Sequence, residues 1–182
     1  MVLTISGAKR IEKKDAPQLF NVVEELSIAA GLPMPAVYLI DDTAPNAFAT
    51  GRDPEHAAVA ITSGLLEKLT RDELQGVMAH ELSHVQNRDI LFSMMVGIMV
   101  GSIVLISDFF VRSVIWGRGG RRKGGDRSSG PLILIGIVLA ILAPFFAKML
   151  QLAVSRQREY LADASGAMLT RYPEGLASAL EK

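Results

Sequence analysis

The chain has 182 residues, 49% hydrophobic and 21% charged, with a mean hydropathy of +0.30, and this much apolar surface excludes a disordered or collagen-like chain. Its 19 basic and 19 acidic residues give a net charge of zero, so no overall field predicts a nucleic-acid partner. Cysteine is absent, which excludes disulfide scaffolds, iron–sulfur clusters and cysteine nucleophiles, and leaves nitrogen and oxygen atoms as the ligands for any metal.

The N-terminal part of the chain reads as a soluble domain. Residues 1–15 contain no long apolar segment, so the sequence predicts no signal peptide. Asp15, with Gln18 three residues later, predicts the start of a helix that Gly31 ends. The apolar residues of this helix recur at helical spacing and predict one buried face: Leu19, Val22, Val23 and Leu26.

Three short apolar or β-prone segments follow, separated by turn residues. They are Ala36–Ile40, Ala47–Ala49 and Ala57–Ile61. Such segments between Asp, Pro, Asn and Gly residues predict strands joined by turns.

Thr70 and Glu73 form the pattern of a capping box, in which each side chain bonds to the backbone of the other residue. The pattern predicts a helix that begins at Arg71. We expect this helix to continue through the apolar segment that follows it.

Two long apolar segments dominate the second half of the chain. Ile90–Ser107 has 18 residues without a charge, and Pro131–Ala147 has 17. Both lengths reach the lower limit for crossing a hydrocarbon core of about 30 Å, so they predict a membrane hairpin; the alternative is a pair of buried core helices. The connecting Gly117–Gly130 is rich in Gly and Arg and predicts a hydrated linker, with contact to anionic lipid head groups as its alternative.

The helix after Thr70 contains His80-Glu81-Leu82-Ser83-His84, an H-E-x-x-H sequence. Positions four apart share one face of a helix, so two imidazoles can bind one zinc ion. Glu81 is placed to reach a water on that metal without becoming a ligand. A catalytic zinc needs a third protein ligand, and without cysteine an acidic side chain is the natural candidate.

Glu159 and Asp163 share one face of the helix that leaves the second apolar segment. Glu159 can be the third ligand, while Asp163 orients a histidine N–H; the alternative is a solvated acidic face. His84 lies six residues before the first apolar segment, and Glu159 lies five residues after Val154. These offsets are about 9 and 7.5 Å along their helices, so an antiparallel hairpin presents both groups at nearly the same height.

Three segments together resemble the HtpX-type membrane zinc peptidases, which are related to the CAAX prenyl endopeptidases. They are Asn46–Arg52, His80–Asp89 and Ser155–Asp163. The resemblance implies zinc ligation by His80, His84 and Glu159, one zinc per chain, and general base and acid work by Glu81. It also implies that Asn87 supports the metal site without being a ligand. A further implication is an edge strand that binds extended substrate through Asn46, Ala47, Phe48 and Ala49.

The resemblance implies an endopeptidase of the inner (plasma) membrane that degrades misfolded or damaged membrane proteins, with its zinc site facing the cytosol. The expected partners of the protein are these membrane-protein substrates and the lipid bilayer. The alternative is a non-catalytic membrane scaffold or holdase. Members of the family usually have a further membrane hairpin before the region that corresponds to this chain, and more residues after it, so we expect a fragment.

The expected fold class is α+β, mostly α: a gluzincin-like zinc peptidase domain with a small sheet, interrupted by a transmembrane helical hairpin. Residues 1–89 form the first part of the peptidase domain and 90–154 the hairpin, while 155–182 hold the third-ligand helix. Candidate groups for stabilising an oxyanion are His56, Arg158, Tyr160 and Tyr172, and their spacing does not choose among them.

Overall fold

A computed structural model describes residues 7–116 and 129–182 of the chain. The chain divides into two units, which we describe separately. Unit 1 comprises Met1–Phe92 and Gln157–Lys182, and unit 2 comprises Ser93–Arg156. Most of the predicted linker at 117–130 lies outside the described residues.

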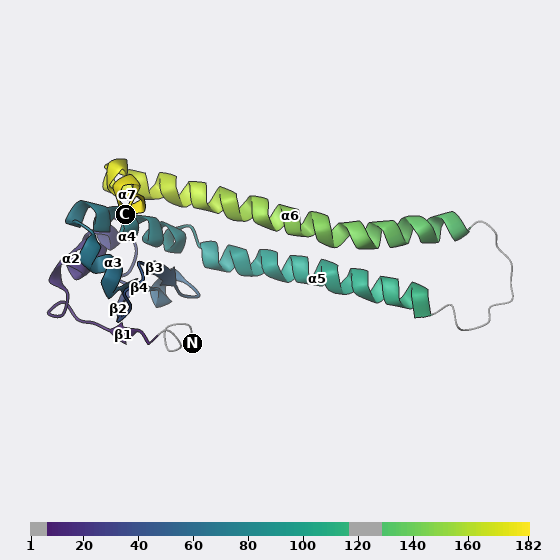
Figure 1. Ribbon diagram of the computed structural model, residues 1–182, viewed down its shortest axis with the longest axis horizontal. Helices are drawn as coiled ribbons and strands as arrows, with labels where there is room; N and C mark the ends of the chain where they lie inside the picture. Colours follow the sequence, from purple (N-terminus) through teal and green to yellow (C-terminus); the bar gives the residue numbers. More distant parts are fainter. Residues whose placement is uncertain (1–6, 117–128) are drawn as a thin grey trace. The chain divides into compact units, whose positions relative to one another are not determined.

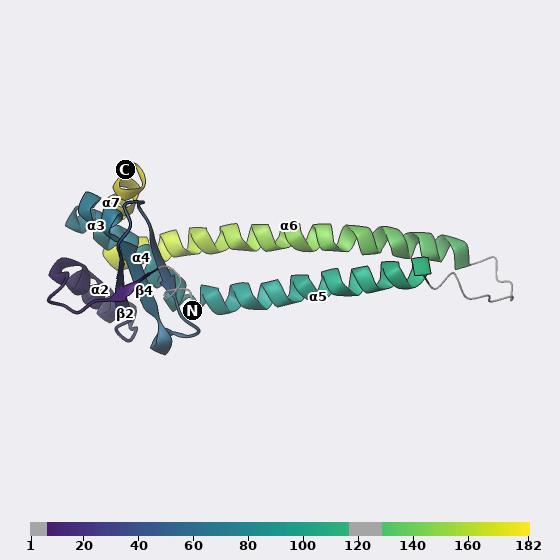
Figure 2. The same ribbon diagram turned by 60° about the horizontal axis from the view of Figure 1, so that its bottom comes forward.

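Unit 1 contains a four-stranded mixed sheet in the order β1-β2-β4-β3 (Figures 1 and 2). The strands are β1 (Lys9–Arg10), β2 (Ala36–Ile40), β3 (Ala47–Thr50) and β4 (Ala58–Thr62). β2 and β4 are parallel, whereas β1 and β3 are antiparallel to their neighbours. All five residues of β4 are buried, and β3 lies at the edge of the sheet. The three predicted strands are confirmed to within one residue.

Helix α2 (Pro17–Ala30) buries the predicted face, which is at most 1% exposed at each of its four residues. Gly31 ends the helix in the left-handed conformation, as predicted (φ 67°). The predicted cap at Asp15 is wrong, because Ala16 occupies the capping position and Pro17 starts the helix. The Asp15 carboxylate instead accepts a hydrogen bond from the Glu12 amide, which closes the preceding turn.

Helix α4 (Arg71–Gln86) is the centre of unit 1, where it contacts α2, β3 and α7 (Pro173–Leu180). The capping box is confirmed: Glu73 N–H donates to Thr70 Oγ1, and Thr70 N–H donates to the Glu73 carboxylate at 2.8 Å. The η1 turn (Pro54–His56) and helix α3 (Ser63–Lys68) complete the connections around the sheet.

The expectation that this helix continues into the apolar segment is wrong. Helix α4 ends at Gln86, and α5 (Asp89–Trp116) begins three residues later. Arg88 has a left-handed backbone (φ 54°), which no α-helix accommodates, so the chain changes direction between the two helices. Asp89 therefore occupies the first turn of a new helix, next to the C-terminal end of α4.

The buried carboxylate of Glu73 connects α4 to α7. Its exposed fraction is 5%, and it accepts hydrogen bonds from Ser178 Oγ at 2.7 Å and Lys182 Nζ at 2.6 Å. These bonds, led by the one from Lys182, lower the pKa of Glu73 from 4.5 to about 2. The carboxylate therefore stabilises the docking of α7 fully above its unfolded pKa of 4.5, and this contribution is lost as the pH falls towards 2.

We expect Glu73→Gln to lower the hydrogen-exchange protection of α7 at neutral pH, because an amide does not carry the charge that Lys182 contacts. The difference from wild type should shrink as the pH falls through 4.5, where the wild-type carboxylate begins to lose its contribution. Exchange rates of peptides from Pro173–Leu180, corrected for intrinsic pH dependence, measure this effect. Glu174→Gln, on the exposed side of α7, is the matched control, and a difference that is constant with pH contradicts the prediction.

Unit 2 consists of two apolar helical segments that run side by side in both views (Figures 1 and 2). They belong to α5 and to α6 (Ser129–Thr170), which contains Pro144. Asp89–Ser113 and Gly136–Thr170 are long and apolar enough to cross a membrane, and only 6% of the most apolar window in each is buried. The side chains are too exposed for the alternative of buried core helices, since an apolar surface of this extent requires a partner or a membrane.

Candidate metal centre

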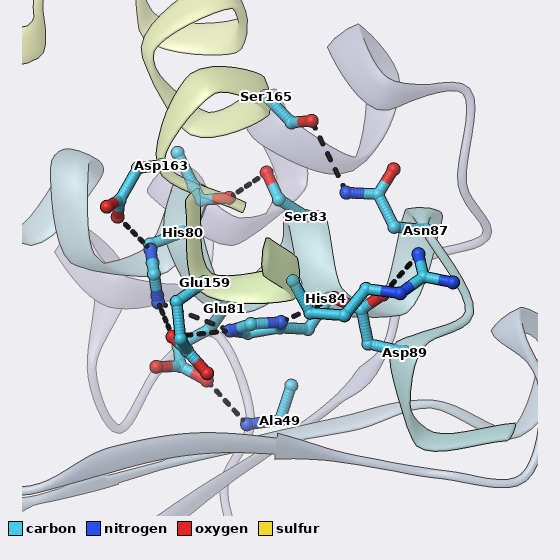
Figure 3. A network of polar contacts seen from close by, with 12 residues as sticks. Ala49, His80, Glu81, Ser83, His84, Asn87, Asp89, Glu159, Asp163 and Ser165 are labelled. Carbon is cyan, nitrogen blue, oxygen red and sulfur yellow. Dashed lines mark hydrogen bonds and ion pairs between the residues drawn. The ribbon is translucent and has the colours of Figure 1, made fainter. Parts of the chain in front are cut away.

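Helix α4 places the two histidines of the H-E-x-x-H sequence on one face, one turn apart (Figure 3). The Nε2 atoms of His80 and His84 are 3.2 Å apart, and the two rings meet edge to face. Both side chains are 18% exposed, so they are half-buried but open to a ligand. On the opposite side of the same helix, Leu82 is buried in the hydrophobic core of unit 1.

Helix α6 brings Glu159 to these histidines. Its Oε2 atom is 3.6 Å from His80 Nε2 and 3.7 Å from His84 Nε2. Two ligands of a tetrahedral zinc ion, each about 2.0–2.1 Å from the metal, lie roughly 3.3 Å apart, so the three observed separations fit one ion. The three side chains form a group that can hold a metal, as the offsets in the sequence predict.

Close packing between α6 and α4 sets the position of Glu159. Ala162 is fully buried, and a Cβ atom added at Gly166 would lie 3.2 Å from the backbone nitrogen of His80. Glycine at this position lets the two backbones approach. The carboxylate one helical turn before Ala162 is thereby held beside the imidazoles.

Each histidine has a carboxylate at its other ring nitrogen. Asp163 Oδ1 lies 2.9 Å from His80 Nδ1, and Asp89 Oδ2 lies 2.7 Å from His84 Nδ1. Asp163 thus lies beside a candidate ligand, and its expected role in orienting that ring stays a prediction. Asn87 contacts neither imidazole; it donates to Ser165 Oγ at 3.3 Å and so links the end of α4 to α6.

The two carboxylates favour one tautomer of each imidazole. A carboxylate beside Nδ1 favours the proton on that nitrogen, which leaves Nε2 as an electron-pair donor. In that tautomer both Nε2 atoms and the Glu159 carboxylate present lone pairs to one small space. This donor set can hold a cation, and imidazole and carboxylate are both ligands that zinc takes.

Glu81 projects from α4 toward β3, where its Oε2 accepts a hydrogen bond from the Ala49 amide at 2.9 Å (Figure 3). Burial raises the pKa of Glu81 above its ordinary value. The two imidazoles and the Ala49 amide oppose this rise, and the Glu159 carboxylate adds to it. A carboxylate with a raised pKa is suited to take up a proton and to return it.

The predicted substrate segment Asn46–Ala49 overlaps β3. The Asn46 carbonyl accepts from the Thr62 amide, and the antiparallel register pairs Phe48 with Ala60. Residues two apart along a strand bond to the same side, so Ala47 and Ala49 direct their backbone groups away from β4. The Ala49 amide already donates to Glu81. The Ala47 amide and the carbonyls of Ala47 and Ala49 face the open edge of the sheet.

Among the four candidates for an oxyanion donor, two already have partners. His56 Nδ1 lies 2.6 Å from Asp53, and Arg158 Nη1 lies 2.9 Å from Asp89. Tyr160 and Tyr172 are 64% and 51% exposed.

Asp89 is the site residue that the sequence reasoning missed, although the family motif includes it. The expectation of one continuous helix concealed its position, because a residue five places after His84 on the same helix faces elsewhere. The signal was Asn87, a residue that often ends helices.

The HExxH helix, the glutamate from a later helix and the edge strand beside them define the gluzincin architecture of metallopeptidases. Residues 13–182 match the family described as Peptidase family M48, and the chain belongs to this family. The resemblance seen in the sequence is therefore confirmed.

Two relatives named "Protease HtpX homolog" illustrate the match. The one from Tropheryma whipplei (strain TW08/27) is 56% identical over 182 residues, which are 100% of this chain and 61% of the relative. The one from Dictyoglomus turgidum (strain DSM 6724 / Z-1310) is 52% identical over 100% of this chain and 59% of the relative. The chain spans about three fifths of the length of these relatives.

The crystal structure of S. mikatae Ste24p has a similar fold. Its TM-score with this chain is 0.65 at 24% sequence identity, over 98% of this chain and 45% of that one. This likeness confirms the fold class: mostly helical, with a small sheet and long apolar helices.

Proposed function

We propose that the protein is a zinc-dependent membrane endopeptidase. The observation that carries this proposal is the convergence of three electron-pair donors, His80 Nε2, His84 Nε2 and Glu159 Oε2, beside the partly buried carboxylate of Glu81. Glu81 is a fourth side chain at this site and is not one of the ligands. A structural zinc site does not need such a carboxylate, whereas hydrolysis requires a base.

In the proposed reaction His80, His84 and Glu159 would hold a zinc ion, which would supply a bound water of lowered pKa and a Lewis acid for the substrate carbonyl. Glu81 takes the proton of the attacking water on its carboxylate and later gives a proton to the departing amine. The Ala49 amide keeps the Glu81 carboxylate oriented at the side of the cleft that faces β3. Asp163 and Asp89 lie at the Nδ1 atoms of His80 and His84, which would leave each Nε2 available as a ligand.

We propose that the substrate is an extended chain that pairs with the free edge of β3. The edge offers the Ala47 amide and the carbonyls of Ala47 and Ala49, which is the pattern required for adding a strand. A folded segment cannot supply such a strand, so misfolded or damaged proteins are the natural substrates.

Ala47→Pro is expected to raise KM about 3–10-fold, because it removes one backbone hydrogen bond to the substrate. Proline is tolerated where the amide faces away from the sheet, so metal content and kcat should be unchanged. Steady-state kinetics on an unfolded protein measure this, with Ala47→Ser as a control that keeps the amide. An unchanged KM contradicts pairing at this edge.

We further propose that α5 and α6 insert in the inner membrane and that the zinc site faces the cytosol, so that the enzyme serves membrane-protein quality control. The length and exposure of the two apolar helices support insertion. Since the native chain has no cysteine, a single cysteine replacing the exposed Glu55 reports the side of the membrane on which unit 1 lies. Labelling that occurs only from the outside of intact cells contradicts the proposed orientation.

The activity itself is tested on the detergent-solubilised protein with an unfolded protein as substrate. We expect cleavage that stops when a chelator removes the metal and returns when zinc is added. Cleavage that persists at the same rate in the metal-free protein overturns the proposal.

A further inference from the structure

We propose that Asp89 is a positioning residue that holds the imidazole of His84 for metal binding, and that Arg158 and Phe92 hold Asp89 in turn. The inference rests on the proposed metal centre. It adds to that centre a buried residue, Asp89, which lies outside the H-E-x-x-H sequence at the start of α5.

Asp89 is 6% exposed, and each of its carboxylate oxygens lies within ion-pair distance of a basic side chain. Oδ2 lies 2.7 Å from His84 Nδ1 (Figure 3). Oδ1 forms an ion pair of 2.9 Å with Arg158 Nη1. A buried carboxylate needs a partner of opposite charge. Arg158 is that partner, and its ion pair holds the Asp89 side chain beside His84.

Phe92 fixes the guanidinium of Arg158. The Arg158 Cζ atom lies 4.0 Å from the centroid of the Phe92 ring, and its side chain is 23% exposed. Phe92 follows Asp89 by three residues, so the carboxylate and the ring lie on the same face of the first turn of α5. Arg158 lies between them and directly precedes Glu159, so this contact joins the segments that carry His84 and the third ligand.

The backbone around Asp89 is consistent with this role. Arg88 holds a left-handed conformation (φ 54°) that costs free energy in a residue with a side chain. This conformation ends α4 and starts α5 at Asp89. A helix that continued through Arg88 would carry Asp89 away from His84 Nδ1.

Asp89 and Asp163, the carboxylates beside His84 and His80, differ in how far they are buried. The Asp163 side chain is 53% exposed, whereas that of Asp89 is 8% exposed. Water replaces an exposed carboxylate easily, but not a buried one. Loss of the Asp89 charge should therefore weaken metal binding more than loss of the Asp163 charge.

Asp89→Asn tests the proposal, because asparagine has nearly the shape of aspartate but does not carry its charge. We expect its zinc affinity, measured by competition with a chelator, to fall about 10–100-fold. The absorption spectrum of the cobalt-loaded protein should also change, since it reports the orientation of the ligands. Asp89→Glu should restore part of the affinity, and Asp163→Asn should cost less than Asp89→Asn.

Asp53→Asn is the matched control, because Asp53 makes a carboxylate–imidazole contact of 2.6 Å with His56, which is not among the three candidate ligands. An Asp89→Asn protein with wild-type affinity and a wild-type cobalt spectrum overturns this inference alone, provided that the wild type binds zinc and Glu159→Ala does not. A wild-type protein that binds no zinc overturns the proposed function, and this inference with it.

Discussion

Glu81→Gln is expected to lower the turnover of peptide hydrolysis by about 10²–10⁴-fold while leaving the bound zinc at the wild-type level. Glutamine has the shape of glutamate, and its carbonyl can still accept the hydrogen bond from the Ala49 amide. It cannot take a proton from water at neutral pH. The substitution therefore separates proton transfer from the structure of the site.

Two measurements on the same preparation check this prediction: zinc per chain, and kcat on an unfolded protein. Glu67→Gln, the same change at an exposed position of α3, controls for the loss of a charge. A non-catalytic scaffold would show no difference between the two variants. Wild-type turnover in Glu81→Gln assigns the base to another residue and contradicts the proposed mechanism.

Glu159→Ala is expected to weaken zinc binding by more than the roughly 10–100-fold typical of residues that only support a ligand. Alanine removes the donor 3.6 and 3.7 Å from the two Nε2 atoms, so the ion keeps two protein ligands. Two imidazoles alone do not make the three-ligand set of a catalytic zinc.

The measurement is zinc retained after dialysis against graded chelator concentrations, with cleavage followed in parallel. Glu174→Ala, an exposed glutamate of α7, is the control. One zinc held as tightly in Glu159→Ala as in the wild type contradicts the ligand assignment and shifts the third ligand to another carboxylate.

Local patterns in the sequence were sufficient to predict much of unit 1. The capping box at Thr70 set the start of α4, and the spacing of His80 and His84 set their common face. The offsets of His84 and Glu159 from the apolar segments predicted that the two groups meet, because rise per residue is a fixed property of a helix.

Features that depend on the backbone or on distant contacts were not predictable. Glycine usually marks a left-handed residue, and here Arg88 occupies that conformation without such a mark. The position of Asp89 followed from it and was missed. The parallel pairing of β2 with β4, which leaves β3 at the edge, depends on which strands meet in space and not on any one strand's composition.

The proposed metal ligands have a consequence for synthesis of the protein. His80 and His84 emerge from the ribosome early, but Glu159 follows only after both apolar segments have been made. A nascent chain that ends before Glu159 therefore has two of the three proposed ligands and no complete metal site. For the proposed enzyme, this order of the residues would delay protease activity until both apolar segments, the proposed membrane anchor, have been made.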